Sequence, residues 1–342
     1  MTSTPTQMRQ EILEIPDAVD RLLCSGAKDI QRAASEARAL DPRFLVSVAR
    51  GSSDHVCTYL KYASELVLRK PMASLGPSVK SVYGTDILCD GALCLSVSQS
   101  GMSPDIVRMT QSITEGGGRS IAITNNGASD LARVASATLP IHAGPELSVA
   151  ATKTFVTSLV AGLWLIAEIR QDAELIAAIH NLPVHLDQAT RCDWSPMVQT
   201  VGDRSLYTIG RGPSWAISNE AALKFKETCQ IHAESYSSAE MLHGPVSIVE
   251  HAFPVLAFAA GDKAEDGLAE VADALADKQA TVFATTDRVK KATPLPHVRT
   301  DHWLTDPVAS VTSFYGLVEA FALSRGINPD APRHLKKVTE TV

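Results

Sequence analysis

The sequence has no excess of basic residues and no long apolar run, and each absence excludes a class of protein. Its 342 residues include 31 Lys and Arg against 38 Asp and Glu, giving a formal net charge of −7. A nucleic-acid-binding surface needs a basic patch, so we expect no nucleic-acid partner. The longest uncharged stretch, Thr154 to Ala167, is too short to span a bilayer. We therefore expect a buried helix there and no membrane partner.

Paired cysteine motifs are also missing. The six cysteines form no C-x-x-C motif, and no histidines cluster near them in the sequence. They lie at positions 24, 57, 89, 94, 192 and 229. We therefore expect reduced structural thiols rather than disulfides or a metal site. Residues Met1 to Gln10 lack a basic stretch followed by an apolar run, so no signal peptide is expected. Together these features predict a cytoplasmic protein.

What the chain does contain is a regular alternation of short β-branched apolar runs with helix-length segments. Such alternation predicts an α/β fold with parallel sheets covered by helices on both faces. A length of 342 residues favours two domains. The predicted buried strands are Phe44–Val48, Leu93–Val97, Ser120–Thr124 and Thr138–Ile141 in the first half, and Ser205–Ile209, Pro254–Ala259, Thr281–Thr285 and Val298–Thr300 in the second.

The two halves also align with each other. Arg50-Gly51 matches Arg211-Gly212, and two later strand segments match at the same offset, since 211 − 50 = 256 − 95 = 281 − 120 = 161. A constant spacing of this kind indicates a duplicated domain. The predicted organisation is an N-terminal helical segment 1–34, a first domain 35–172, a helical linker 173–201, a second domain 202–326 and a C-terminal tail 327–342.

A hydroxyl-rich turn follows the second predicted strand. Ser98-Gln99-Ser100-Gly101 precedes Ser103 and a proline that suits the first turn of a helix. Free backbone N–H groups and the positive end of a helix dipole bind an anion there without Lys or Arg. A simple helix cap is the alternative. The second copy has Ala259-Ala260-Gly261-Asp262 at this place, which favours a single phosphate site in the first copy. Ser52 and Ser53, after the first strand, either join this site or cap their own helix.

Charged residues cluster in the second copy. Lys224 and Glu227 are three residues apart, so they share a helix face with Glu220. A carboxylate can move a proton between sugar carbons, an ammonium can stabilise the enolate, and a histidine such as His243 can open a sugar ring. A solvated charged face is the alternative. The tail ending at Lys337 is typical of a frayed terminus, although a lysine there could form a Schiff base.

These segments together resemble the sugar isomerase (SIS) domain family, over nearly the whole chain. The resemblance is to the double-SIS isomerase part of glutamine–fructose-6-phosphate aminotransferases and to stand-alone glucosamine-6-phosphate deaminases of the SIS type. It implies two tandem SIS domains, each a doubly wound parallel sheet flanked by helices. The motifs that carry it are Gly51-Ser52-Ser53, Ser98–Gly101, Val149-Ala-Ala-Thr152-Lys153, Ala222–Glu227, Ile231–Glu234, His243-Gly-Pro and Pro332–Lys337.

The resemblance also implies roles for individual residues. Phosphate ligands fall on Ser52, Ser53, Ser98, Gln99, Ser100 and Ser103, and sugar contacts on Val149 and Ala151. The proton-shuttling carboxylate falls on Glu227 with Lys224 beside it, the ring-opening histidine on His243, and the Schiff-base lysine on Lys337. In relatives the histidine reaches the neighbouring subunit, which implies a homodimer. The chain departs from the family pattern at Arg50, commonly Cys, and at Ala151, a family serine.

The expected function is an amino-sugar phosphate deaminase/isomerase. No glutaminase domain or N-terminal cysteine nucleophile is present in this sequence, so we expect glucosamine 6-phosphate to be converted to fructose 6-phosphate and ammonia. The chemistry requires no metal or redox cofactor. The alternatives are a deglycase or isomerase of another hexosamine or fructosamine 6-phosphate, an aminotransferase without a glutaminase, and a non-catalytic sugar-phosphate sensor. A sensor of this kind carries a DNA-binding domain, and residues 1–34 are too short for one.

Overall fold

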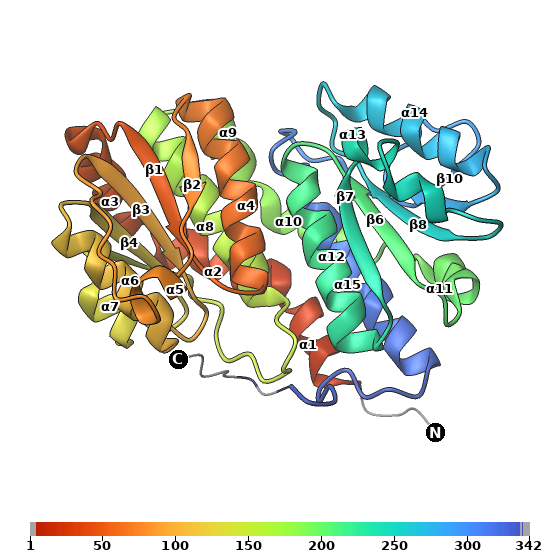
Figure 1. The fold of residues 1–342 in the computed structure, drawn as a ribbon, viewed down its shortest axis with the longest axis horizontal. Coiled ribbons are helices and arrows are strands. Elements are labelled where there is room, and N and C mark those ends of the chain that lie inside the picture. Colours follow the sequence, from red (N-terminus) through yellow and green to blue (C-terminus); the bar gives the residue numbers. More distant parts are fainter. Residues whose placement is uncertain (1–4, 336, 338–342) are drawn as a thin grey trace. The chain divides into compact units, whose positions relative to one another are not determined.

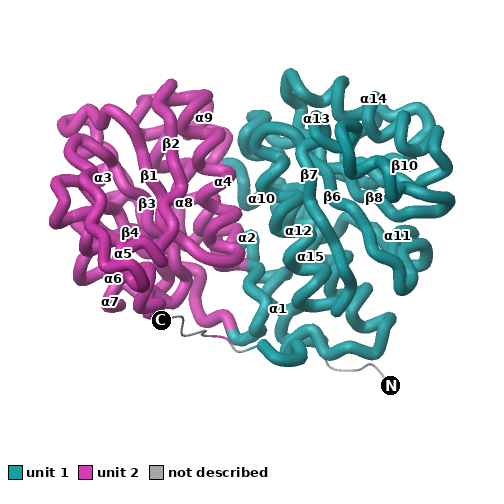
Figure 2. The backbone as a smooth tube through the Cα atoms, in the orientation of Figure 1, with its two compact units in different colours: residues 1–16, 147–152, 181–335 teal, residues 17–146, 153–180, 336–342 magenta. Residues whose placement is uncertain are grey.

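The computed structural model describes residues 5–335 and 337, which fall into two compact units (Figure 2). Unit 1 comprises residues 1–16, 147–152 and 181–335, and unit 2 comprises residues 17–146, 153–180 and 336–342. Residues 1–4, 336 and 338–342, which belong to the predicted N-terminal segment and C-terminal tail, lie outside the described residues. The domain boundaries expected from the sequence stay a prediction. Each unit contains a five-stranded parallel sheet (Figure 1).

The sheet of unit 2 has the strand order β2-β1-β3-β4-β5. Its inner strands are runs of Val, Ile, Leu and Ala that are buried on both faces, as helices cover a parallel sheet on each side. The strands are β1 (Phe44–Val48), β2 (Met72–Ser74), β3 (Ala92–Val97), β4 (Arg119–Thr124) and β5 (Ala137–Pro140). The helices are α2 (Ile15–Ser25), α3 (Ala27–Leu40), α4 (Ser52–Ala63), a π-helical turn (Ser64–Leu68), α5 (Ser78–Ser81), α6 (Pro104–Glu115), α7 (Asp130–Val134), α8 (Lys153–Arg170) and α9 (Ala173–His180).

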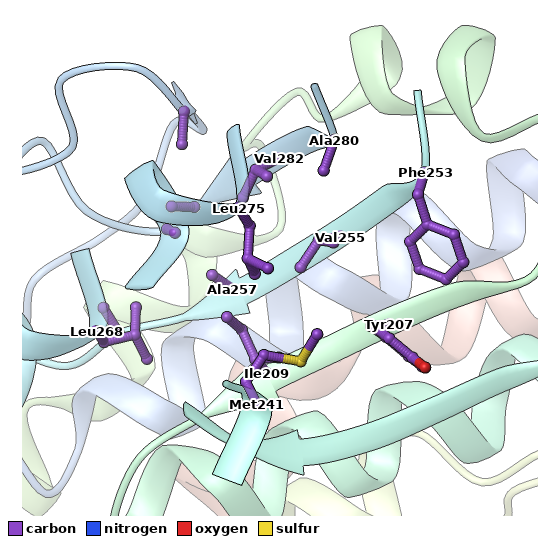
Figure 3. Close-up of a cluster of buried hydrophobic side chains, with 14 residues drawn as sticks. Tyr207, Ile209, Met241, Phe253, Val255, Ala257, Leu268, Leu275, Ala280 and Val282 are labelled. Atoms are coloured by element: carbon purple, nitrogen blue, oxygen red, sulfur yellow. The ribbon is translucent and has the colours of Figure 1, made fainter. Parts of the chain in front are cut away.

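The sheet of unit 1 has the order β10-β9-β8-β6-β7. Figure 3 shows its core, in which Ile209, Val255 and Val282 from the strands meet Leu268 and Leu275 of α14. The strands are β6 (Leu206–Gly210), β7 (Ala233–Ser237), β8 (Pro254–Phe258), β9 (Thr281–Ala284) and β10 (Thr293–Pro294). The helices are α1 (Gln7–Leu13), α10 (Leu182–Ala189), α11 (Ser195–Val201), α12 (Pro213–Cys229), α13 (Ser238–Met241), a 3-10 turn (Pro245–Ile248), α14 (Glu265–Ala276) and α15 (Asp306–Ser324).

The predicted α/β class and the duplication are confirmed. Gly51 precedes α4 with φ 55° and ψ −133°, and Gly212 precedes α12 with φ 56° and ψ −135°. Both dihedral pairs have a positive φ that favours glycine. Helices α6 and α14 begin and end at the same offset, because 265 − 104 = 276 − 115 = 161. The two copies therefore share the backbone conformation of the glycine before α4 and α12, and the positions of α6 and α14.

One predicted strand is wrong and three were missed. Residues 298–300 form no strand, because Arg299 and Thr300 direct hydrogen bonds to Ala259, Thr285, Glu265 and Asp306 instead of to a sheet. The strand at this edge of the sheet is β10, which ends at Pro294, and proline inside a strand is typical of an edge strand. The missed strands β2, β7 and β10 are edge strands with polar residues or proline, so they lack the apolar run that marks a buried strand.

The segment after α15 is held by hydrogen bonds. The Asp330 carboxylate accepts the backbone N–H groups of Gln7 and Met8 at 2.9 and 2.8 Å, at the start of α1. The Asp330 carbonyl accepts the N–H of Val149 at 3.3 Å. A carboxylate satisfies the free N–H groups and the positive dipole of a helix N-terminus. The tail as far as Asp330 therefore caps a helix and positions the Val149 segment.

All six cysteine thiols are free, and Cys57, Cys89, Cys94 and Cys229 are buried. Burial raises the pKa of the Cys94 thiol to about 12, so this thiol is a structural group rather than a reactive one. Within the described ranges, no helix combines the length and the apolar character needed to cross a membrane.

We expect the Asp330→Ala variant to lower the free energy of unfolding by about 1 kcal/mol, because two N–H groups of α1 lose their acceptor. Urea unfolding followed by circular dichroism measures this change. The control is Asp187→Ala, which removes an exposed ion pair with Arg191 and should cost less. Equal stability of the two variants would contradict a capping role for Asp330.

Candidate active site

The predicted phosphate-binding residues lie at the carboxyl ends of β1 and β3, which are neighbours in the sheet of unit 2. Ser52 and Ser53 are the first residues of α4, and Gly51, not a serine, occupies the capping position. Ser98, Gln99 and Ser100 follow β3, and the turn reaches α6 at Ser103. Open parallel sheets bind ligands at this edge. We call this set of serines together with Gln99 the cradle.

The hydroxyl groups of the cradle are arranged to donate. Ser98 Oγ accepts the N–H of Gly101 at 3.2 Å, and Ser100 Oγ accepts the N–H of Met102 at 3.3 Å. A hydroxyl that accepts a backbone N–H retains its own hydrogen for a phosphate oxygen. Ser103 holds the capping position of α6, but its side chain forms no capping hydrogen bond. Helix capping therefore does not explain this serine, and phosphate binding by the cradle stays a prediction.

Gly101 determines the shape of the turn. Its φ is +65°, and a Cβ atom there would lie 2.2 Å from Ser129 Oγ. The Gly101 carbonyl accepts the N–H of Leu131 at 3.0 Å, so the turn is also tied to α7. A side chain at this position would displace the backbone on which the cradle hydroxyls are mounted.

Charged side chains border the cradle. The Arg50 guanidinium donates from Nε to Asp105 at 2.9 Å, which ties the end of β1 to the first turn of α6. Asp105 is buried, whereas Arg50 is half exposed. Burial raises the pKa of the Asp54 carboxyl, in the first turn of α4, although His55, Arg50 and Ser74 act in the opposite direction. Arg50 thus places a cation beside the cradle.

The equivalent turn of unit 1 already contains an anion. The carboxylate of Asp306 accepts the N–H of Gly261 at 2.7 Å and the N–H of Thr300 at 2.7 Å. Asp306 is 2% exposed. At the start of α14, Glu265 is bound by Arg299 at 2.6 Å. Internal carboxylates therefore occupy the place that an external anion would take in the second copy.

The charged residues of α12 are buried. Lys224 Nζ lies 2.5 Å from Glu227 Oε2 and 3.3 Å from Glu220 Oε1. The side chains of Glu220 and Lys224 are 0% and 1% exposed, and that of Glu227 is 24% exposed. The alternative of a solvated charged face is therefore wrong for Glu220 and Lys224. Glu227 is the member of the group that retains access to solvent.

The protonation state of Lys224 follows from its partners. Burial alone would lower the pKa of the Lys224 ammonium, but the carboxylates of Glu220 and Glu227 outweigh burial and raise this pKa above its usual value. The stability that the charged form of Lys224 contributes is thus fully present at neutral pH and is lost as the pH rises through the folded-state pKa of Lys224. Lys224 is a fixed cation beside the Glu227 carboxylate.

The predicted residues Val149, Ala151 and His243 lie on other segments of the chain. Val149 and Ala151 are partly buried in the segment 147–152, which is held by the Glu11 carboxylate through the N–H of Ser148 at 3.3 Å. His243 follows α13, and its side chain is exposed. Its backbone N–H donates to the Glu240 carbonyl at 2.9 Å. The role of His243 toward a second subunit stays a prediction.

Lys337 has a partner that the sequence did not predict. Its Nζ lies 3.4 Å from Oε2 of Glu146, whose side chain is 0% exposed. Glu146 also accepts the N–H of Thr154 at 3.1 Å and its hydroxyl at 2.5 Å, at the start of α8. Glu146 lies three residues before Val149. Its position next to the Val149 motif is the sequence feature that could have identified it.

A metal site was not expected, and the part of the chain that the structure describes contains no group of three or more His, Cys, Asp or Glu side chains arranged to hold a metal ion.

We expect Gly101→Ala to weaken the binding of inorganic phosphate at least about tenfold, because the strained turn and the clash with Ser129 displace the cradle. Isothermal titration calorimetry measures the affinity. Gly326→Ala is the matched control, since Gly326 has a φ of +69° but no atom within 4 Å of its Cβ position. Phosphate binding that survives Gly101→Ala unchanged would exclude this turn as the site.

We expect Asp306→Ala to lower the free energy of unfolding by about 1–3 kcal/mol, because the buried N–H groups of Gly261 and Thr300 lose their acceptor. Denaturant unfolding measures the loss. The control Asp266→Ala removes an exposed carboxylate that pairs with Arg288. It should cost below about 1 kcal/mol. If both variants match the parent chain, Asp306 does not stabilise the second turn.

This chain is similar to known proteins in both sequence and structure. It is 31% identical to the isomerizing glutamine–fructose-6-phosphate aminotransferase of Pyrobaculum aerophilum, in an alignment that covers 97% of this chain and 57% of that protein. The chain thus spans little more than half the length of this curated relative. A solved structure from Silicibacter pomeroyi DSS-3, provisionally named a phosphosugar isomerase, is 63% identical with a TM-score of 0.93, covering 95% of this chain and 100% of that one.

The fold extends to more distant structures. The C-terminal domain of glucosamine-fructose-6-phosphate aminotransferase from Francisella tularensis is 23% identical with a TM-score of 0.83, and the match covers 96% of this chain and 99% of that domain. The model of the SIS domain matches residues 41–168 and 201–318, one match in each half of the duplication. With both parallel sheets matched in this way, the chain belongs to the SIS domain family and contains two SIS domains.

Proposed function

We propose that this chain is a phosphosugar isomerase of the SIS family that acts as an amino-sugar phosphate deaminase. The reaction is the conversion of glucosamine 6-phosphate and water to fructose 6-phosphate and ammonia. The observation that carries the proposal is the buried Lys224 ammonium beside the partly exposed Glu227 carboxylate. The names of the relatives from Pyrobaculum aerophilum and Silicibacter pomeroyi DSS-3 support the sugar-phosphate class of substrate.

The chemistry begins with ring opening. His243 moves a proton from the C1 hydroxyl to the ring oxygen, which releases an open-chain aldehyde. Glu227 then removes the C2 proton, and the charge that develops on O1 is stabilised by Lys224. Return of that proton to C1 produces the C2 imine. Water adds to the imine, ammonia leaves, and fructose 6-phosphate remains, so atoms and electrons balance.

The cradle residues have the complementary task of holding the phosphate. They offer hydroxyl, amide and backbone donors with Arg50 nearby, and they need no metal. Val149 and Ala151 contact the sugar in this proposal. Lys337 holds the open-chain carbonyl, and the Glu146 carboxylate orients its ammonium. The tail that carries Lys337 closes the active site.

We further propose that the chain works as a homodimer in which His243 serves the site of the neighbouring subunit. The exposure of the His243 side chain within one chain supports this arrangement. The same proposal includes a cytoplasmic location and no cofactor.

The test is a substrate panel of glucosamine 6-phosphate, galactosamine 6-phosphate and fructosamine 6-phosphates, with ammonia and ketose phosphate measured as products. We expect turnover of glucosamine 6-phosphate. Glu227→Gln should reduce kcat by at least about a hundredfold because the base is lost, while substrate affinity stays within a few fold. The matched control is Glu240→Gln, which changes an exposed glutamate of α13 in the same unit.

No ammonia from any hexosamine 6-phosphate would refute the deaminase. Interconversion of aldose and ketose phosphates without ammonia release would instead assign the chain as a simple isomerase. Full activity of Glu227→Gln would refute Glu227 as the base.

A further inference from the structure

The turn after β3 leaves a backbone donor without a protein partner. Among the residues that the structure describes, the N–H of Ser100 has no acceptor. Ser100 corresponds to Gly261 in the second copy, because 261 − 100 = 161, the offset of the duplication. The N–H of Gly261 donates to the Asp306 carboxylate at 2.7 Å. The duplication therefore indicates that the donor at this position of the turn serves to bind an anion.

The internal anion of unit 1 is accompanied by a guanidinium. Arg299 Nη1 lies 3.7 Å from the Asp306 carboxylate, and it donates to the carbonyl of Ala259, directly after β8, at 3.1 Å. Arg299 also pairs at 2.6 Å with Glu265, in the first turn of α14. The anion of this turn thus accepts a backbone N–H and lies beside an arginine that is anchored to the following helix.

Arg50 has corresponding surroundings in unit 2. Its Nε donates at 2.9 Å to Asp105, in the first turn of α6, which is the helix that follows the cradle turn. The Asp105 side chain is 1% exposed, and that of Arg50 is 50% exposed. Within the described ranges, neither Nη group of Arg50 has a hydrogen-bond partner. The guanidinium is therefore anchored through Nε and retains its Nη donors for an external acceptor.

The pairing of Arg50 with Asp105 is specific to the first copy. The second copy has the same two residue types at the same offset, Arg211 and Asp266, since 211 − 50 = 266 − 105 = 161. There Arg211 donates to a serine of β7 at 3.3 Å, and Asp266 is 74% exposed and pairs with Arg288. The pair is therefore formed in the copy in which no described carboxylate accepts the equivalent N–H of the turn.

The charges around the cradle require a cation. Asp54 and Asp105 lie in the first turns of α4 and α6, the helices that border the cradle. Carboxylates there repel a phosphate, whose charge at neutral pH is about −1.5 to −2. Arg50 pairs with Asp105, and it also opposes the rise in the pKa of the Asp54 carboxyl that burial causes. Without this guanidinium, hydroxyls and helix dipoles would have to hold a phosphate against two carboxylates.

We propose that Arg50 is a ligand of the substrate's phosphate group. Its Nη groups donate charge-assisted hydrogen bonds to the phosphate that the cradle holds, and Asp105 positions the guanidinium through Nε. The inference rests on the proposed function, which places the phosphate in the cradle. It adds a cationic ligand to a site otherwise composed of neutral donors.

The first experiment measures the binding of inorganic phosphate by isothermal titration calorimetry at neutral pH. We expect Arg50→Gln to weaken binding at least about tenfold, because charge-assisted hydrogen bonds are lost. The matched control is Arg211→Gln, which removes the equivalent exposed arginine of the second copy and should leave the affinity unchanged. Equal affinities of Arg50→Gln and the parent chain would overturn the inference.

A second set of variants separates a phosphate ligand from a mere counter-ion of Asp105. Arg50→Gln leaves a buried carboxylate without its partner, which by itself opposes phosphate binding and destabilises the chain. Asp105→Asn removes that charge and retains an acceptor for Nε. In this background, Arg50→Gln should still weaken phosphate binding at least about threefold. No effect of Arg50→Gln in the Asp105→Asn background would assign Arg50 as a counter-ion only and would overturn the inference.

Activity distinguishes the failure of this inference from the failure of the proposed function. If the parent turns over a hexosamine 6-phosphate, Arg50→Gln should raise KM more than it lowers kcat, because the phosphate is bound before and during the reaction. If the parent binds phosphate without such turnover, the deaminase proposal fails, and the calorimetry still decides the role of Arg50. If the parent binds no phosphate, the cradle and the inference about Arg50 fail together.

Discussion

A parallel strand that runs into a helix leaves backbone N–H groups at its carboxyl end, and these groups need an acceptor. The duplicated fold creates such turns in both units: one pair follows β1 and β6, with glycines of nearly identical dihedrals at Gly51 and Gly212, and another pair follows β3 and β8. In the turn after β8 the acceptor is internal, because the Asp306 carboxylate accepts the N–H of Gly261. In unit 2 the turn after β3 is lined with hydroxyls. The difference between these two solutions separates the predicted binding copy from the copy that is closed by its own side chains.

The interior of the second copy contains a cluster of charged side chains. Helix α12 buries a lysine between two glutamates, an arrangement that is stable only when each charge has a partner. Helix α15 supplies Tyr315 to that group and Asp306 to the turn after β8. One helix thus supports both the charged cluster and the closed anion turn of unit 1.

Much of the fold could be predicted from the sequence because its signals are local. Seven of the eight predicted strands coincide with observed strands to within a residue at each end, since a buried parallel strand is a short run of apolar residues. Strands β2, β7 and β10 were not predicted, because edge strands need no such run. Residues 298–300 have strand-like composition. The side chains of Arg299 and Thr300 instead donate hydrogen bonds to the carbonyl of Ala259, after β8, and to Asp306, at the start of α15.

The sequence by itself determined the duplication, the strand-to-helix turns and the common helix face of Glu220, Lys224 and Glu227, because these depend on spacing along the chain. It could not distinguish a solvated charged face from a buried one. The tertiary structure decided that Lys224 is buried, that Tyr315 reaches Glu220, that Asp306 fills the second turn and that Glu146 holds Lys337. Each of these contacts joins residues far apart in the sequence. Spacing sets which side chains can face the same way, but the packing of distant segments decides whether they are buried and which distant residues contact them.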